Sequence, residues 1–75
     1  MITIKVVVLE DMKAYESDRT TLLWEVTEGD VLTAEYYAPS QEFFAINEKG
    51  QEVYVGEITY DGSLILEGAF RLERE

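Results

Sequence analysis

Apolar residues recur at every second position along most of this chain. The first segment is the clearest example, with Ile2, Ile4, Val6 and Val8 on one side and Thr3 opposite. Successive side chains of a β-strand point to opposite faces, so a period of two indicates strands and disfavours helices. We therefore expect an all-β domain.

Turn-forming residues separate the alternating segments. Gly29 follows the second segment, Pro39 ends the third, and Asp61-Gly62 is a reversal signal of the type I′ kind. The pattern predicts strands over residues 2–9, 21–26, 31–37, 43–47 and 53–59, with a tight hairpin turn at 48–51. The polar segment 10–20 is either a long loop or a loose, charged hairpin.

The last part of the chain, residues 63–73, is open to two interpretations. Leu64 to Leu66 and Phe70 to Leu72 are consistent with two short strands, or with a 3₁₀ turn and a strand, on either side of a break at Gly68. A short helix over 64–72 is the alternative, but a central glycine costs a helix about 1 kcal/mol. We favour the strands, and short strands at regular spacing predict a small barrel or sandwich.

The length and the missing residue types limit the functions that this chain can have. At 75 residues it is expected to form one domain, residues 1–75. It contains no Cys and no His, which removes disulfides, thiolate metal sites and the commonest catalytic base. No Gly-rich phosphate loop or calcium-loop spacing occurs. We expect no catalytic residue, no metal and no cofactor, and hence a protein that is not an enzyme.

The chain is strongly acidic, with 16 Asp and Glu residues against six Lys and Arg residues and a formal net charge of −10. Such a field repels nucleic acids and anionic membranes and attracts a protein with a basic patch. The N-terminal residues lack the features of a signal peptide, and the run Val6 to Leu9 is too short to span a bilayer. We expect a cytoplasmic protein that binds neither nucleic acid nor membrane.

The order of strands and turns resembles an SH3-like barrel of five to six short antiparallel strands. The segment Leu22 to Leu32 is similar to the stretch around the SH3 diverging turn, residues 10–20 match the RT loop, and Ala38 to Glu42 match the n-Src loop. The chain also resembles short SH3-like proteins of phages and prophages of Gram-positive bacteria. The OB-fold is the second candidate, but it usually carries a helix between its third and fourth strands, and none is predicted here.

The resemblance implies a protein-binding role. In peptide-binding SH3 domains, aromatics of the RT loop, the third strand and the 3₁₀ turn hold proline-rich segments. Tyr15 and Phe43 match two of these places, whereas Leu66-Glu67-Gly68-Ala69 replaces the Pro and Tyr of the third. We predict an adaptor or inhibitor whose contact surface combines the acidic loop with aromatics: Glu10, Asp11, Tyr15, Glu16, Asp18, Tyr37 and Phe43. The alternatives are a nucleic-acid mimic that occupies a DNA- or RNA-binding protein, and a structural subunit of a larger assembly; the oligomeric state stays open.

Overall fold

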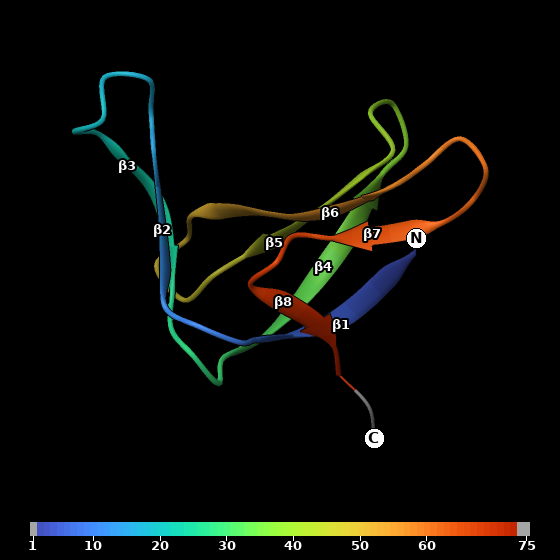
Figure 1. Ribbon diagram of the computed structural model, residues 1–75, viewed down its shortest axis with the longest axis horizontal. Helices are drawn as coiled ribbons and strands as arrows, with labels where there is room; N and C mark the ends of the chain where they lie inside the picture. The colour runs from blue at the N-terminus through green and yellow to red at the C-terminus, as the bar shows by residue number, and fades with distance from the viewer. Residues whose placement is uncertain (1, 74–75) are drawn as a thin grey trace.

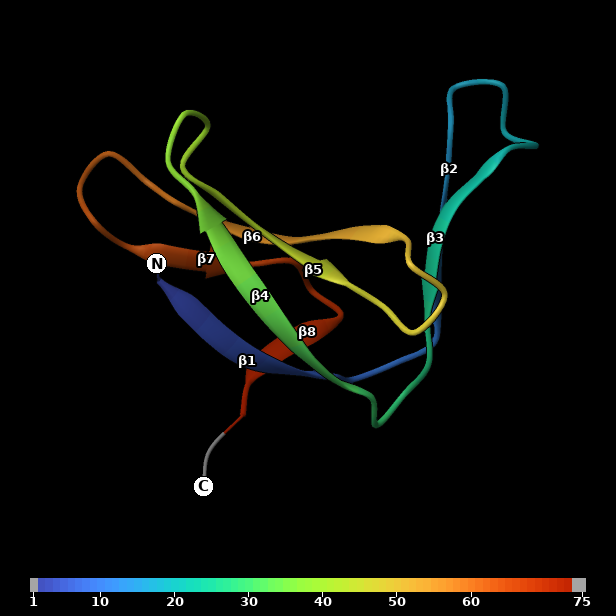
Figure 2. The same ribbon diagram turned by 180° about the vertical axis from the view of Figure 1, so that it is seen from behind.

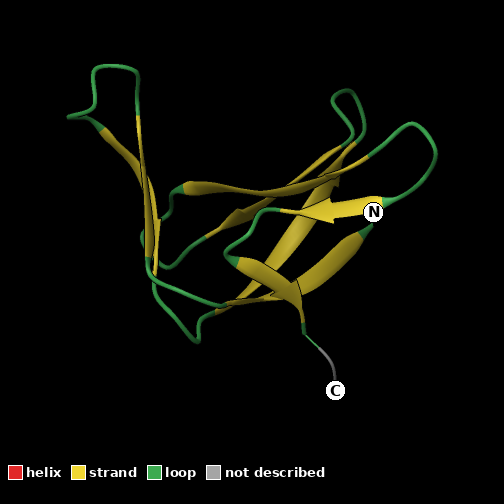
Figure 3. Ribbon diagram, viewed as in Figure 1, coloured by secondary structure: helices red, strands yellow, loops and turns green. Residues whose placement is uncertain are grey.

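The computed structural model describes residues 2–73, and every regular element within that range is a β-strand (Figures 1 and 3). The strands are β1 (Thr3–Val8), β2 (Met12–Tyr15), β3 (Leu22–Val26), β4 (Val31–Tyr37), β5 (Glu42–Ile46), β6 (Glu52–Ile58), β7 (Leu64–Leu66) and β8 (Phe70–Leu72). Over these residues, no helix is long and apolar enough to cross a membrane. The predicted all-β class is confirmed.

Six of the strands form one antiparallel sheet in the order β7-β6-β5-β4-β1-β8. The two outermost strands, β7 and β8, are consecutive in the chain and only residues 67–69 join them. Three residues reach about 10 Å, so the two edges of the sheet must lie near one another. The sheet therefore curls into a small, nearly closed barrel, which is consistent with the SH3-like resemblance.

The core of the barrel is made by alternate residues of its strands. Val6 and Val8 of β1, Ala34 of β4, and Val53 and Val55 of β6 are at most 1% exposed. The apolar side of the first segment is therefore buried at Val6 and Val8, whereas Ile2 is exposed. Fully burying one such aliphatic side chain contributes about 1.5–3 kcal/mol to the free energy of folding, so these core side chains dominate the stability of the barrel.

The two remaining strands, β2 and β3, form a separate hairpin whose tip stands away from the barrel (Figures 1 and 2), whereas Val26 at its base belongs to the barrel core. Segment 10–20 is thus the arm and tip of a hairpin rather than an irregular loop. Its tip is closed by Asp18, whose carboxylate accepts hydrogen bonds from the main-chain N–H groups of Thr20 and Thr21, both at 2.9 Å. An isolated two-stranded hairpin is marginally stable, so this one needs contacts with the barrel.

Two amide side chains supply such a contact. The Asn47 side-chain amide donates to the carbonyl of Glu25 in β3 and to the Gln51 side-chain oxygen, both at 2.8 Å. The same Gln51 oxygen accepts from the Glu25 N–H at 3.1 Å, and Lys49 forms an ion pair with the Glu25 carboxylate. Because Asn47 and Gln51 flank the β5–β6 turn, this turn holds the hairpin against the barrel.

The predicted turns at glycines are present, but the turn type predicted for Asp61-Gly62 is not. Gly29, Gly50 and Gly62 all have positive φ angles, as tight reversals require. A type I′ turn at Asp61-Gly62 would need a positive φ at both residues, and Asp61 does not have one. The type I′ prediction is wrong. The loop between Thr59 and Ser63 is longer than two residues, so one left-handed residue, Gly62, completes the reversal.

The tail forms the two short strands β7 and β8, separated by a break at residues 67–69, so the predicted strands are confirmed and the helix is excluded. The helix expected of an OB-fold between the third and fourth strands is also absent from residues 2–73.

Candidate functional site: the outer face of strands β4 to β6

The structure gives two of the predicted contact residues internal partners. Asp11, between β1 and β2, accepts a hydrogen bond from the main-chain N–H of Glu28 at 2.8 Å. Asp18 closes the hairpin tip. Its carboxylate accepts hydrogen bonds from the main-chain N–H and the side-chain hydroxyl of Thr21 and from the main-chain N–H of Thr20, and these bonds lower its pKa to about 2. Both carboxylates therefore shape the hairpin. Glu10, Tyr15 and Glu16 are exposed.

Phe43 is not a surface residue, and its prediction as a contact residue is corrected. Its side chain is only 2% exposed and packs against the ring of Tyr36, with the ring centroids 5.2 Å apart. Register explains this placement, because β5 pairs Phe43 with Tyr36 and Ala45 with Ala34 on the inward side. The neighbouring Phe44 points outward instead.

Tyr15 and Tyr37 are both about half exposed, but they belong to different parts of the molecule. Tyr15 ends β2 in the hairpin, whereas Tyr37 ends β4 in the barrel. The hairpin and the end of β4 lie on opposite sides of the molecule in both ribbon views (Figures 1 and 2). The loop and the aromatics predicted as one surface are therefore not brought together.

A different aromatic surface is formed by outward side chains of β4, β5 and β6, which we call the outer face. We define it by the residues Val31, Thr33, Glu35, Tyr37, Glu42, Phe44, Ile46, Glu52 and Tyr54. Phe44 lies at its centre, since the register places it between Glu35 of β4 and Tyr54 of β6. The Phe44 and Tyr54 rings meet edge to face with centroids 5.8 Å apart, so they support one another.

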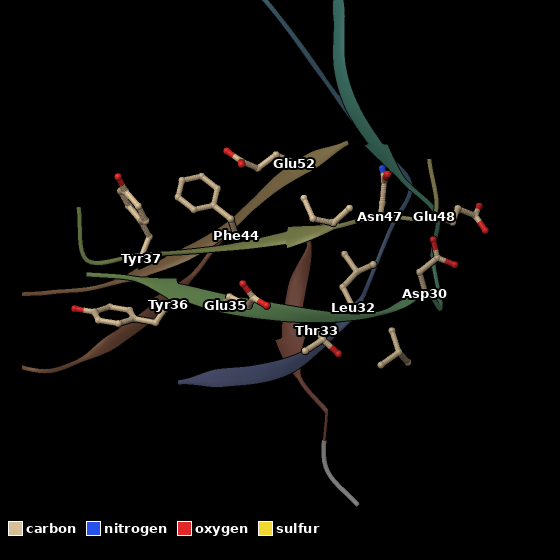
Figure 4. A pocket seen from close by; sticks show the side chains of 12 residues that line it. Asp30, Leu32, Thr33, Glu35, Tyr36, Tyr37, Phe44, Asn47, Glu48 and Glu52 are labelled. Carbon is tan, nitrogen blue, oxygen red and sulfur yellow. The ribbon is translucent and has the colours of Figure 1, made fainter. Parts of the chain in front are cut away.

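The outer face is hollowed and acidic. The hollow has a volume of about 630 Å³, and its apolar lining includes Val31, Tyr37 and Ile46, which are 49–62% exposed. Figure 4 shows the carboxylates of Glu35, Glu48 and Glu52 among the side chains that line it, together with the rings of Tyr37 and Phe44. The acidic lining residues are Asp30, Glu35, Glu48 and Glu52, and no Lys or Arg is among the described residues that line it.

Tyr54, which packs against Phe44 on the outer face, lies near a second set of carboxylates that do not line the hollow. Partial burial raises the pKa of its phenol, and the carboxylates of Glu57, Glu42 and Glu67 raise it further. Negative charges disfavour the phenolate, and the same charges favour a cation placed on this side of the sheet. The outer face therefore combines apolar surface with a negative potential.

Phe44, Ile46, Glu35 and Glu52 are not among the contact residues predicted from the sequence. A signal is present, because each of them is next to an inward residue in its strand and points to the other face. In β5, however, both faces are apolar, so alternation alone did not distinguish Phe43 from Phe44.

Within residues 2–73, no three carboxylates gather closely enough to form a metal site. A scan against models of protein families and searches of curated proteins and of solved structures found no match to this chain.

Proposed function

We propose that this chain is a non-catalytic protein-binding module, and that its outer face holds a basic segment of a partner protein. The observation that carries this proposal is the hollow around Phe44, whose described lining combines aromatic and aliphatic side chains with four carboxylates and contains no Lys or Arg. Protein interfaces have the same plan, with aromatic anchors at the centre and polar groups at the rim.

Arginine and lysine side chains fit this arrangement better than other residue types. A guanidinium group stacks on the ring of Tyr37 or Phe44 through a cation–π contact. Its N–H groups then reach a carboxylate such as Glu35 or Glu52, and charge-assisted hydrogen bonds of this kind are about twice as strong as neutral ones. The net charge of −10 steers a basic partner toward the protein over a longer range.

This proposal moves the contact surface from the hairpin to the barrel. Of the aromatics predicted as contact residues, Tyr37 stays in the proposed surface, and the outward Phe44 takes the place of the buried Phe43. The membership of the barrel in the SH3-like group is part of the proposal, and the likeness to phage and prophage proteins stays a prediction that the comparisons do not test.

Two matched double variants test the proposal. Glu35→Gln with Glu52→Gln removes two charges from the outer face, and Glu10→Gln with Glu16→Gln removes two charges from the hairpin region. The probe is a fluorescent peptide in which arginines alternate with leucines, and fluorescence anisotropy measures its affinity at low salt and at about 0.5 M salt.

The outer-face double variant should weaken peptide binding about tenfold or more, while the hairpin double variant should change it about twofold or less. Equal weakening by both variants contradicts the proposal, because binding would then depend on net charge alone, as expected of a nucleic-acid mimic. An affinity that does not fall with salt also contradicts it.

A further inference from the structure

The barrel has an open seam between β7 and β8, a surface separate from the outer face. Within the described chain, β7 pairs with β6 and β8 pairs with β1, and the two strands do not pair with one another. They diverge from the short connection at residues 67–69, as the two orange-red arrows in Figure 1 show. The seam is therefore the place where the barrel stops short of closure.

The seam contains an apolar hollow of about 430 Å³. Its lining consists of Leu64 and Leu66 from β7 and Phe70, Arg71 and Leu72 from β8. Leu64 and Leu72 are 36% and 42% exposed, so apolar surface is left in contact with water. The volume falls within the range of about 300–1,000 Å³ that is typical of ligand sites.

The main chain of β7 presents to this hollow groups that have no partner among residues 2–73. The N–H of Glu67 donates to the carbonyl of Val55 at 2.9 Å, which fixes the phase of the β6–β7 ladder. Hydrogen-bonded residues alternate along an antiparallel strand, so Ile65 also faces β6. The N–H and C=O groups of Leu64 and Leu66 then point away from β6, toward the free edge.

The same reasoning applies to β8. Ala69 accepts a hydrogen bond from the β1 side of the sheet at 2.6 Å, and Glu73 donates one to β1 at 2.9 Å. The main-chain groups of Phe70 and Leu72 therefore point away from β1. The Phe70 N–H is satisfied by the Glu67 carbonyl at 3.0 Å, which leaves the Leu72 N–H facing the seam.

We propose that the seam binds an extended segment of another protein, which adds as a further strand along β7 and β8. An extended backbone is the partner that matches donors and acceptors repeating every second residue beside an apolar hollow. Its inward positions would carry apolar side chains. Arg71 is the one charged residue that lines the described hollow, so one acidic side chain of the segment would pair with it. The net charge of −10 disfavours a segment with many acidic residues.

A blocked peptide with the order Thr-Val-Glu-Val-Thr-Val-Thr serves as the probe, since about seven extended residues span about 23 Å. Hydrogen exchange followed by NMR should show fast exchange of the Leu64, Leu66 and Leu72 amide hydrogens in the free protein. Millimolar peptide should slow their exchange. The same peptide N-methylated at alternate residues should have no effect. Unchanged exchange at these three amides with the unmodified peptide would overturn the proposal.

A matched pair of variants locates the site. Leu64→Glu places a charge at the mouth of the hollow and should weaken the peptide about tenfold or more. Ile65→Glu changes the neighbouring residue, which is 52% exposed and does not line the hollow, and should change the affinity about twofold or less. Equal weakening by both variants contradicts the seam as the site. So does a concentration-dependent dimer that Leu64→Glu dissociates, since a second copy would then be the occupant.

This test is independent of the proposed function. The double variant Glu35→Gln with Glu52→Gln should leave the affinity for the Thr-Val-Glu-Val-Thr-Val-Thr peptide unchanged within about twofold, since neither residue lines the seam.

Discussion

At the scale of single residues, Asn47 has the most consequential role in the described structure. Its side chain is 9% exposed, and its oxygen accepts from the N–H groups of Lys49 and Gln51 at 3.0 and 2.9 Å. Its amide group bonds Glu25 and Gln51, so one residue both shapes the β5–β6 turn and holds the hairpin. A buried amide that makes all its hydrogen bonds adds to the stability of the fold, whereas a buried polar group that loses its hydrogen-bond partner lowers it.

Replacing Asn47 by Ala should lower the free energy of unfolding by about 2–3 kcal/mol, because buried partners lose their hydrogen bonds. Gln51→Ala should act in the same direction, and the double variant should cost less than the sum of the two, since both residues serve one network. Urea denaturation followed by circular dichroism measures all three. Strict additivity would show that the two amides act independently.

Asp18 provides a residue-scale prediction for pH. Its pKa is lowered to about 2 from an ordinary 3.8, chiefly by the main-chain N–H of Thr21. A depressed pKa means that the ionised carboxylate supports the folded tip above pH 3.8, and that this support is lost as the pH falls through about 2. NMR titration of the Asp18 carboxyl should give a midpoint near 2. In the variant Thr21→Val, which lacks the side-chain hydroxyl donor, the midpoint should rise. An ordinary midpoint in the native protein would contradict the closed tip.

At the scale of elements, β6 depends on a glycine where two strands approach closely. A Cβ built on Gly56 would clash with the carbonyl oxygen of Ile65 and lie 3.0 Å from the Cα of Leu66, both main-chain atoms of β7. Gly56 also pairs with Phe43, beside the irregularity in the β5–β6 register. Glycine at this position permits β6 to bend between its two neighbours.

Gly56→Ala should therefore destabilise the protein by about 1–3 kcal/mol, because backbone must shift to admit the methyl group. Gly68→Ala is the matched control. No atom lies within 4 Å of a Cβ at Gly68, and its φ is not positive, so its effect should stay within about 0.5 kcal/mol. Thermal unfolding by calorimetry compares the two, and equal effects would contradict the close contact of β6 with β7.

Strand identity was predictable from the sequence to the extent that one face of each strand is apolar. The predicted segment Val31 to Tyr37 forms β4 with those bounds, and its alternate residues Leu32 and Ala34 are buried. Phe43-Phe44 does not alternate, so its orientation depends on pairing with β4, which a local pattern does not contain. The hydrogen bonds of the Asn47 and Gln51 side chains with Glu25 were unpredictable for the same reason, since Asn47 is 22 residues and Gln51 is 26 residues from Glu25 in the sequence.

At the scale of the whole molecule, the barrel has two separate surfaces that differ in charge and in the strands that form them. The outer face carries aromatic rings among carboxylates, and the seam between β7 and β8 carries apolar side chains beside one arginine. A basic segment and a largely uncharged extended segment are therefore expected at different places. The hairpin stands apart from both, held by the β5–β6 turn.

The location of the basic partner is the central claim, and NMR chemical-shift mapping with the arginine–leucine peptide tests it most directly. The largest shifts should occur at Glu35, Phe44 and Ile46 on the outer face, and the amides of Tyr15 and Glu16 in the hairpin should stay unchanged. Shifts concentrated in the hairpin, or spread evenly over all acidic loops, would contradict the account.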